Sequence, residues 1–91
     1  MPYPHEHAAR IRNPDAFEPN SFRSKQISRG IRMILGKLKG SSTMTAQAYR
    51  FAADQFTADE AKRWLREHDV KYISFEPASN REMNERIRKR K

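Results

Sequence analysis

The strongest local constraint on the fold is a helix start at Thr57. Thr57 and Glu60 have the spacing of a capping box, in which the threonine hydroxyl and the glutamate carboxylate each accept a hydrogen bond from the other residue's backbone amide. Behind this start, side chains recur at positions i, i+3, i+4 and i+7 on one helical stripe: Ala61, Trp64, Leu65 and His68. This spacing predicts an amphipathic helix over 58–68, one face of which must pack against another element.

The segment before this helix has the pattern of a β-hairpin. Apolar side chains alternate imperfectly with basic ones over 30–39, and Gly36 within it indicates a bulge or a close approach of another segment. The turn residues 40–42 follow, and 43–51 is rich in Thr, Tyr and Phe, which favour strands. We therefore predict an antiparallel hairpin over 30–51.

A further short strand is predicted over 70–75, where it is stopped by Pro77. Together with the hairpin this strand makes a small antiparallel sheet, and helix 58–68 covers one face of it, so the fold class is α+β. The predicted core places two side chains of the helix, Trp64 and Leu65, against four of the sheet, Ile31, Met33, Ala48 and Ile73.

The N-terminal residues are predicted to form an irregular arm. Four of the five prolines lie within the first 20 residues, at Pro2, Pro4, Pro14 and Pro19. Proline removes a backbone donor and restrains the residue before it, which leaves room only for a short helix over 6–12. Phe17 and Phe22 are expected to fold back onto the core.

The C-terminal residues are predicted to form a basic helix. Ser79 and Glu82 repeat the capping-box spacing and open a helix over 80–88 that has few apolar side chains. The chain is thus divided into one α+β domain over 1–78, which includes the arm, and a basic helical tail over 79–91.

The charge is unevenly distributed along the chain. The 91 residues contain 19 Lys and Arg and 11 Asp and Glu, a formal net charge of +8. Eight basic and three acidic residues lie in 1–40, five basic and six acidic in 41–78, and six basic and two acidic in 79–91. A nearly neutral body therefore has two basic flanks, a pattern typical of proteins that bind anionic partners.

Several function classes lack the residues they need. The chain has no cysteine, which excludes disulfides and thiolate chemistry. No apolar run approaches the roughly 18 residues that span a bilayer, and the polar, proline-broken first seven residues predict no secretory signal, so we expect no membrane association. The glycines at 30, 36 and 40 do not have Walker A spacing, and no nucleophile elbow is present.

The only candidate metal ligands are the two histidines of His5-Glu6-His7. Residues two apart lie on one side of an extended strand, where two imidazoles can reach one zinc ion. A structural zinc site usually takes four ligands, and His68 is the only other imidazole in the chain. We therefore expect no metal and no cofactor, with the two histidines on a solvated arm.

Basic residues near aromatic ones make nucleic acid a candidate partner. Lys37, Lys39 and Arg50 lie on the predicted hairpin beside Tyr49 and Phe51. A second basic group lies in the tail and comprises Arg86, Arg88, Lys89, Arg90 and Lys91. Such charges attract phosphates without sequence preference. The alternatives are a flank that only confers solubility and a surface that binds an acidic protein.

As a set, a series of short segments resembles a family of small bacteriophage and prophage proteins of uncharacterised activity, found near head-assembly and prohead-protease genes. These segments are Glu6-His7-Ala8-Ala9-Arg10, Asn13-Pro14, Phe17, Ser21-Phe22-Arg23, Gly36-Lys37-Leu38-Lys39-Gly40, Gln47-Ala48-Tyr49-Arg50-Phe51, Ala61, Trp64-Leu65, His68 and Phe75-Glu76-Pro77-Ala78. The resemblance covers about residues 6 to 78 and carries over no catalytic residue of the protease. It implies a bacterial host cytoplasm or a virion as the location.

The polar residues within these segments are candidate binding residues. If the arm folds back on the hairpin, one polar surface gathers Glu6, His7, Arg10, Arg23, Lys37, Lys39, Gln47, Tyr49 and Arg50. The alternative is structural: Arg10 and Arg23 form ion pairs with Glu6, Asp15 or Glu76 that hold the arm in place.

These observations favour a non-catalytic, phage-type accessory module that binds nucleic acid or an acidic protein through its basic surface. A first alternative is a small nuclease or phosphate-ester hydrolase that uses Glu6, His7, Arg10 and Lys37, and it requires His7, Arg10 and Lys37 to meet at a common cleft. A second alternative is an inhibitor of a host defence protein. The oligomeric state is not predicted by the sequence.

Overall fold

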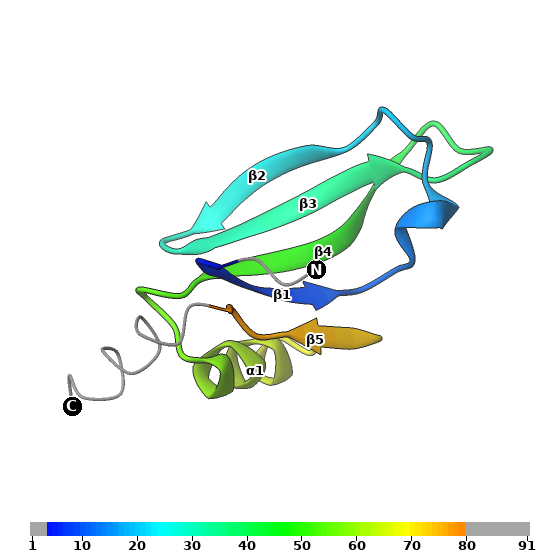
Figure 1. Cartoon of the computed structure of the whole chain (residues 1–91). Helices are drawn as coiled ribbons and strands as arrows, with labels where there is room; N and C mark the ends of the chain where they lie inside the picture. Colours follow the sequence, from blue (N-terminus) through cyan, green and yellow to red (C-terminus); the bar gives the residue numbers. More distant parts are fainter. Residues whose placement is uncertain (1–3, 80–91) are drawn as a thin grey trace.

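A computed structural model describes residues 4–79 as a five-stranded antiparallel sheet with one helix (Figure 1). The elements follow the chain as β1 (Glu6–Arg10), the 3-10 turn η1 (Pro14–Ala16), β2 (Arg23–Ser28), β3 (Ile31–Lys37), β4 (Met44–Ala52), α1 (Ala58–Glu67) and β5 (Ser74–Glu76). The strand order is β2-β3-β4-β1-β5, and all neighbours are antiparallel. The predicted α+β class, with a small sheet packed by a helix, is confirmed.

The helix and the hairpin form where the local patterns place them. Thr57 Oγ1 accepts from the Glu60 amide at 3.1 Å, and Glu60 Oε1 accepts from the Thr57 amide at 2.8 Å, which is the predicted capping box. Strands β3 and β4 pair from Ile31 opposite Phe51, and the pairing register shifts between Ile34 and Leu35. The register skips Gln47, so the irregularity lies in β4 and not in β3, where Gly36 was predicted to mark a bulge or a close approach.

The prediction of an irregular N-terminal arm with a short helix over 6–12 was wrong for residues 6–10, which form a strand, whereas 11–22 are irregular apart from η1 and one isolated bridge. Residues Glu6–Arg10 form β1, which lies inside the sheet between β4 and β5. Ala9 illustrates this position, because it lies opposite Tyr49 on one side and Phe75 on the other. Among the described prolines, Pro4 precedes this strand and Pro14 and Pro19 follow it, so none of them occupies a position within a strand.

Two other strands also differ from the prediction. β2 was not predicted, because its sequence RSKQIS contains one apolar residue, Ile27, and so shows no alternation, and every one of its residues is exposed, as an edge strand permits. The strand predicted over 70–75 is shorter and later, at Ser74–Glu76. The residues before Ser74 instead form the chain reversal after α1. There Asp69 adopts a positive φ of 55°, and the Val70 amide donates to the Leu65 carbonyl.

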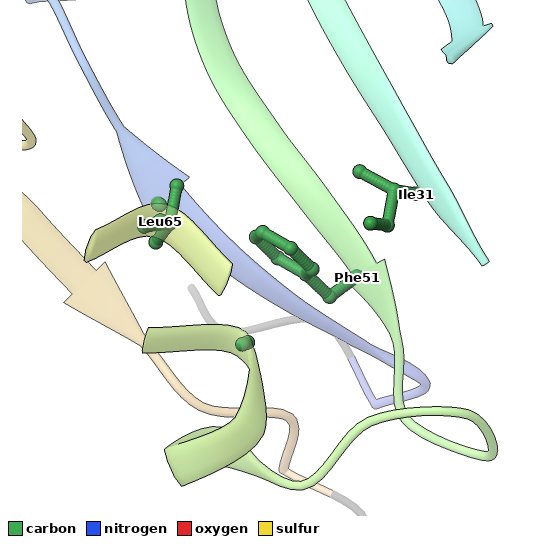
Figure 2. Close-up of a cluster of buried hydrophobic side chains, with 5 residues drawn as sticks. Ile31, Phe51 and Leu65 are labelled. Carbon is green, nitrogen blue, oxygen red and sulfur yellow. The ribbon is translucent and has the colours of Figure 1, made fainter. Parts of the chain in front are cut away.

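The main core lies between α1 and one face of the sheet (Figure 2). Its buried members come from β1, β3, β4 and α1 and are Ala9, Ile31, Phe51, Ala61 and Leu65. Trp64 packs edge-on against Phe51, with ring centroids 5.6 Å apart. Ile31 and Leu65 were predicted core residues, whereas two others were wrong: Ala48 is buried on the opposite face, and Ile73 is 65% exposed.

A smaller apolar cluster covers one end of the face opposite α1, which we call the open face. Phe17 is 2% exposed and forms an isolated bridge with Leu38, so the turn η1 is held against the end of β3. Its ring lies 5.5 Å from that of Phe22. Both rings pack over Gly36, which confirms the predicted close approach at this glycine. No other helix or strand of the part of the chain that the structure describes covers the rest of the open face.

The predicted C-terminal helix over 80–88 lies outside the described residues, as do the basic residues of the tail. The described part of the chain contains no helix that is both long and apolar enough to cross a membrane.

Candidate functional site

The open face holds a groove whose lining follows from strand alternation. In β1, His7 and Ala9 point toward α1, so Ala8 and Arg10 point to the opposite side. Residues directly opposite each other in antiparallel strands share a face, which brings Arg50 of β4 beside Ala8. The resulting groove has a volume of about 510 Å³.

Two arginines from adjacent strands, Arg10 of β1 and Arg50 of β4, line this groove from the open face, and Arg23 of β2 lies at its rim. Its floor consists of small or aliphatic side chains, Ala8, Ile34 and Ala48, and its walls include Pro14 and Phe22. The hollow exists because alanines occupy the floor where larger side chains would fill it. Cationic groups thus surround an apolar floor, and we call this site the arginine groove.

The carboxylate of Glu6 pairs with two arginines beside the groove, Arg32 and Arg50. Glu6 accepts two hydrogen bonds from Arg32, from Nε and Nη2, each at 2.8 Å, and its Oε1 lies 3.7 Å from Arg50 Nη1. The Arg32 hydrogen bonds, together with the charges of Arg32 and Arg50, hold the pKa of Glu6 below its usual value despite partial burial. Glu6 therefore stays ionised and offsets one of these two positive charges.

Among the described residues, Arg10 pairs with a carboxylate only loosely. Its Nη2 lies 4.0 Å from Glu76 Oε1, and both side chains are more than a third exposed. Exposed ion pairs at this distance contribute little, about 0–1 kcal/mol, so Arg10 can exchange Glu76 for another anion at small cost. The structural alternative predicted for Arg10 is thus present in the form of a weak pair, and Glu6 pairs with Arg32 and Arg50 instead.

The structure gathers part of the predicted binding set into the groove. Arg10, Arg23, Gln47 and Arg50 line it together. Lys37 lies in a neighbouring hollow, which Arg23 also lines, and Lys39 is exposed in the turn after β3. Tyr49 belongs to the other face, where its ring lies 5.8 Å from that of Trp64.

Sequence reasoning missed Arg32 as a member of this surface. Arg32 is the direct cross-strand neighbour of Arg50, and each arginine follows an apolar residue that faces α1. The alternation of apolar and polar side chains along β3 and β4 indicates that each arginine points away from the core. Placing Arg32 and Arg50 side by side requires the pairing register of the two strands. The tail residues Arg86, Arg88, Lys89 and Arg90 lie outside the described residues.

His7 lies on the helix-facing side of β1 and has a structural role. Its side chain is fully buried, its Nδ1 accepts from the Ala78 amide at 2.8 Å, and its Nε2 lies 2.8 Å from the Phe56 carbonyl oxygen. The first contact requires an unprotonated Nδ1, so the neutral ring donates from Nε2. Burial lowers the pKa of His7, which favours this neutral form.

This placement separates the residues proposed for hydrolysis. His7 points away from the face that carries Arg10, and Lys37 lines a hollow that includes neither residue. The common cleft that a nuclease or phosphate-ester hydrolase requires is therefore not formed by these side chains. Both ring nitrogens of His7 are also engaged, and the described residues contain no group of three or more metal-ligating side chains.

Comparisons with protein-family models, with curated proteins and with solved structures found no match to this chain.

Proposed function

We propose that the chain binds nucleic acid and that the arginine groove contacts the phosphate backbone. The observation that carries this proposal is the convergence of Arg10 and Arg50, from the adjacent strands β1 and β4, on one groove of the sheet face that no described helix covers, with Arg23 at its rim. A guanidinium group is planar, remains charged at all physiological pH values and can donate two parallel hydrogen bonds to a phosphate.

The spacing of the arginines supports a polymeric anion. Neighbouring strands lie about 4.8 Å apart, so arginines on adjacent strands present a series of positive charges across the sheet. A phosphate backbone offers negative charges in a similar regular series. The strands are joined by backbone hydrogen bonds, so the arginines are positioned before a ligand arrives.

Binding should be measured by fluorescence anisotropy with a labelled oligonucleotide over 50–200 mM salt. The full chain is used throughout, so that the basic tail contributes equally to every variant. Arg10→Gln should weaken binding and reduce the slope of log K against log salt by about 0.7–0.9, the value of one phosphate contact. The matched control is Arg63→Gln, which removes an exposed arginine of α1 and should change the slope much less.

Two results would overturn the proposal. One is the absence of binding at 50 mM salt, and the other is an equal loss in the Arg10 and Arg63 variants. In either case an acidic protein would become the better candidate partner. The accessory-module role, the likeness to phage proteins and the inhibition of a host defence protein stay predictions from the sequence.

A further inference from the structure

The two edges of the sheet differ in what they offer to a further strand. β5 forms one edge with only three residues, and Pro77 follows it directly. Short strands and prolines are devices that keep other strands from adding to a sheet. β2 forms the other edge with six residues, all exposed and none of them proline, and Figure 1 shows it away from α1. Of the described strands, β2 therefore has the edge that can accept a new partner.

The hydrogen bonds between β3 and β4 show which backbone groups face β2. The Ala52 amide donates to the Gly30 carbonyl oxygen at 2.7 Å. The pair next to this bond, Ile31 opposite Phe51, is therefore a non-hydrogen-bonded pair of the β3–β4 ladder. The backbone N–H and C=O of Ile31 thus point away from β4 and toward β2. The direction alternates along a strand, so those of Met33, two positions on, also point toward β2.

This phase assigns the outward groups of β2. Met33 lies opposite Lys25, so Lys25 directs its own backbone N–H and C=O toward β3. The residues on either side of it, Ser24 and Gln26, direct theirs away from the sheet. No described element lies beyond them. The edge therefore presents two donors and two acceptors in a regular series to an incoming strand.

Side chains limit this series at both ends. The Phe22 carbonyl oxygen accepts a hydrogen bond from Arg23 Nη1 at 2.8 Å. The Ser28 carbonyl oxygen accepts one from Gln26 Nε2 at 3.4 Å, and the register with β3 becomes irregular between Gln26 and Ser28. The backbone groups of Ser24 and Gln26 lie between these two side-chain contacts. The part of the edge that can pair regularly is therefore short and covers residues 23–26.

The charge of β2 selects the kind of strand that fits. Arg23 and Lys25 are two residues apart, so both side chains lie on the same face of β2, and both are exposed. Because their backbone groups face β3, an antiparallel strand added to the edge would meet them in non-hydrogen-bonded positions. Facing residues there have Cα atoms about 4.5 Å apart, and their side chains are close. Carboxylates opposite Arg23 and Lys25 would be favourable, and cations unfavourable.

We propose that β2 binds an extended acidic segment of another protein, which adds to the sheet as a sixth, antiparallel strand. The backbone of that segment forms hydrogen bonds with Ser24 and Gln26. Two of its carboxylates, two residues apart, lie beside Arg23 and Lys25. Main-chain hydrogen bonds supply affinity in this mode of recognition, and the facing side chains supply specificity.

A second copy of this chain fits the edge poorly. The register in which the outward groups of both copies meet places Ser24 opposite Gln26, and Lys25 then lies directly opposite Lys25 of the second copy. Like charges in directly opposite positions destabilise a strand pair. The proposal also does not rest on nucleic-acid binding, because the paired arginines of the groove, Arg10 and Arg50, lie on β1 and β4.

The test uses the full chain and a fluorescent eight-residue peptide in which glutamate alternates with valine, at about 50 mM salt. With glutamates beside the two cations, the valine amides point to β2 and the glutamate amides point away from it. Methylation of the valine amides should weaken binding at least about tenfold, because it removes the hydrogen bonds that join the strands. The matched control is methylation of the glutamate amides, which should weaken binding much less. A peptide with lysine in place of glutamate should not bind.

Hydrogen exchange locates the bound peptide on the chain. At nine-tenths saturation, exchange of the Ser24 and Gln26 amides should slow about tenfold, because only the free molecules exchange there. The Lys25 amide, which already faces β3, should change less. Lys25→Gln should weaken binding of the glutamate peptide about two- to fivefold. Lys71→Gln, which removes an exposed lysine after α1, is the matched control and should have a smaller effect.

Four results would overturn strand addition at β2. The first is no binding of the glutamate peptide, and the second is equal binding of the lysine peptide. The third is an equal effect of the two methylations, or exchange at Ser24 and Gln26 that stays unchanged, since charge alone would then hold the peptide. The fourth is concentration-dependent protection of these amides without peptide, which would assign the edge to a second copy. Arg10→Gln should leave peptide binding unchanged, so nucleic-acid binding by the groove stands or fails separately.

Discussion

His7 shows how a residue predicted for chemistry can serve stability instead. Its ring joins the Phe56 carbonyl to the Ala78 amide and thereby connects the chain before α1 to the chain after β5. Within the sequence this histidine is indistinguishable from a metal ligand or a general base. The alternation of side chains along β1 distinguishes a structural from a chemical role, because it turns His7 toward the core and Arg10 toward the open face.

The buried ring of His7 predicts a loss of stability in mild acid. Its folded pKa is lowered by burial, so the unfolded chain takes up this proton first as the pH falls. The contribution to the free energy of unfolding is complete above the unfolded pKa of about 6.5 and decreases below it, by up to about 1.4 kcal/mol per pH unit. Urea unfolding at pH 7.5 and 5.5 measures this decrease.

The control for this prediction is His7→Leu, which cannot titrate. The variant should be less stable at pH 7.5 by about 1–3 kcal/mol, because the Phe56 carbonyl and the Ala78 amide lose their partner. Its stability should fall less between pH 7.5 and 5.5 than that of the wild type. An equal decrease in both proteins would contradict the assignment.

Gly36 predicts a second effect at the residue scale. A Cβ atom on Gly36 would lie 2.8 Å from Phe17 Cδ2, closer than real contacts allow, and 3.0 Å from Phe22 Cδ1, which is tighter than most real contacts. Gly36→Ala should therefore destabilise the fold by about 1–3 kcal/mol, as overpacking does. In a Phe17→Leu background the cost should be smaller, which a double-mutant cycle by urea unfolding measures; strictly additive losses would refute the contact.

At the scale of elements, the capping box predicts the stability of α1. Thr57→Ala removes the acceptor for the Glu60 amide and should cost about 1 kcal/mol, within a range of 0.5–2. Thr43→Ala, at an exposed position before β4, is the matched control and should be nearly neutral. The midpoint of chemical unfolding reports both, and a neutral Thr57 variant would show that the cap is not needed.

Local elements were predictable here because their signals lie within a few residues. The capping box spans Thr57 to Glu60, and the hairpin partners of β3 and β4 follow each other in the chain. β1 was missed because its five residues resemble a helix as much as a strand, and its partners lie far away in the sequence. β2 was missed because an exposed edge strand needs no apolar alternation.

At the scale of the whole molecule, the balance of charge on the open face predicts how ligand affinity can be increased. Glu6 is the carboxylate that Arg32 and Arg50 share. Glu6→Gln removes the negative charge that partly offsets these two arginines. Binding of the labelled oligonucleotide at low salt should strengthen about two- to fivefold, the equivalent of about 0.5–1 kcal/mol.

The cost in stability of Glu6→Gln should be small at neutral pH, since partly exposed ion pairs contribute about 0–1 kcal/mol. Anisotropy titrations of the wild type and the variant side by side test the prediction, with Glu67→Gln on α1 as a control for the change in net charge. Weaker binding by the Glu6 variant would mean that Glu6 supports the groove rather than competes with the ligand.

The sequence by itself determined the helix, its cap, the β3–β4 hairpin and the excess of positive charge. Each of these depends on hydrogen bonds, periodicity or composition that neighbouring residues specify. Only the tertiary structure decided that β1 lies between β4 and β5, with Ala9 opposite both Tyr49 and Phe75. The arginine groove depends on that decision, because strand register determines which alternate side chains share a face. A shift of one residue in β1 would bury Arg10 and expose His7, and no local pattern excludes such a shift.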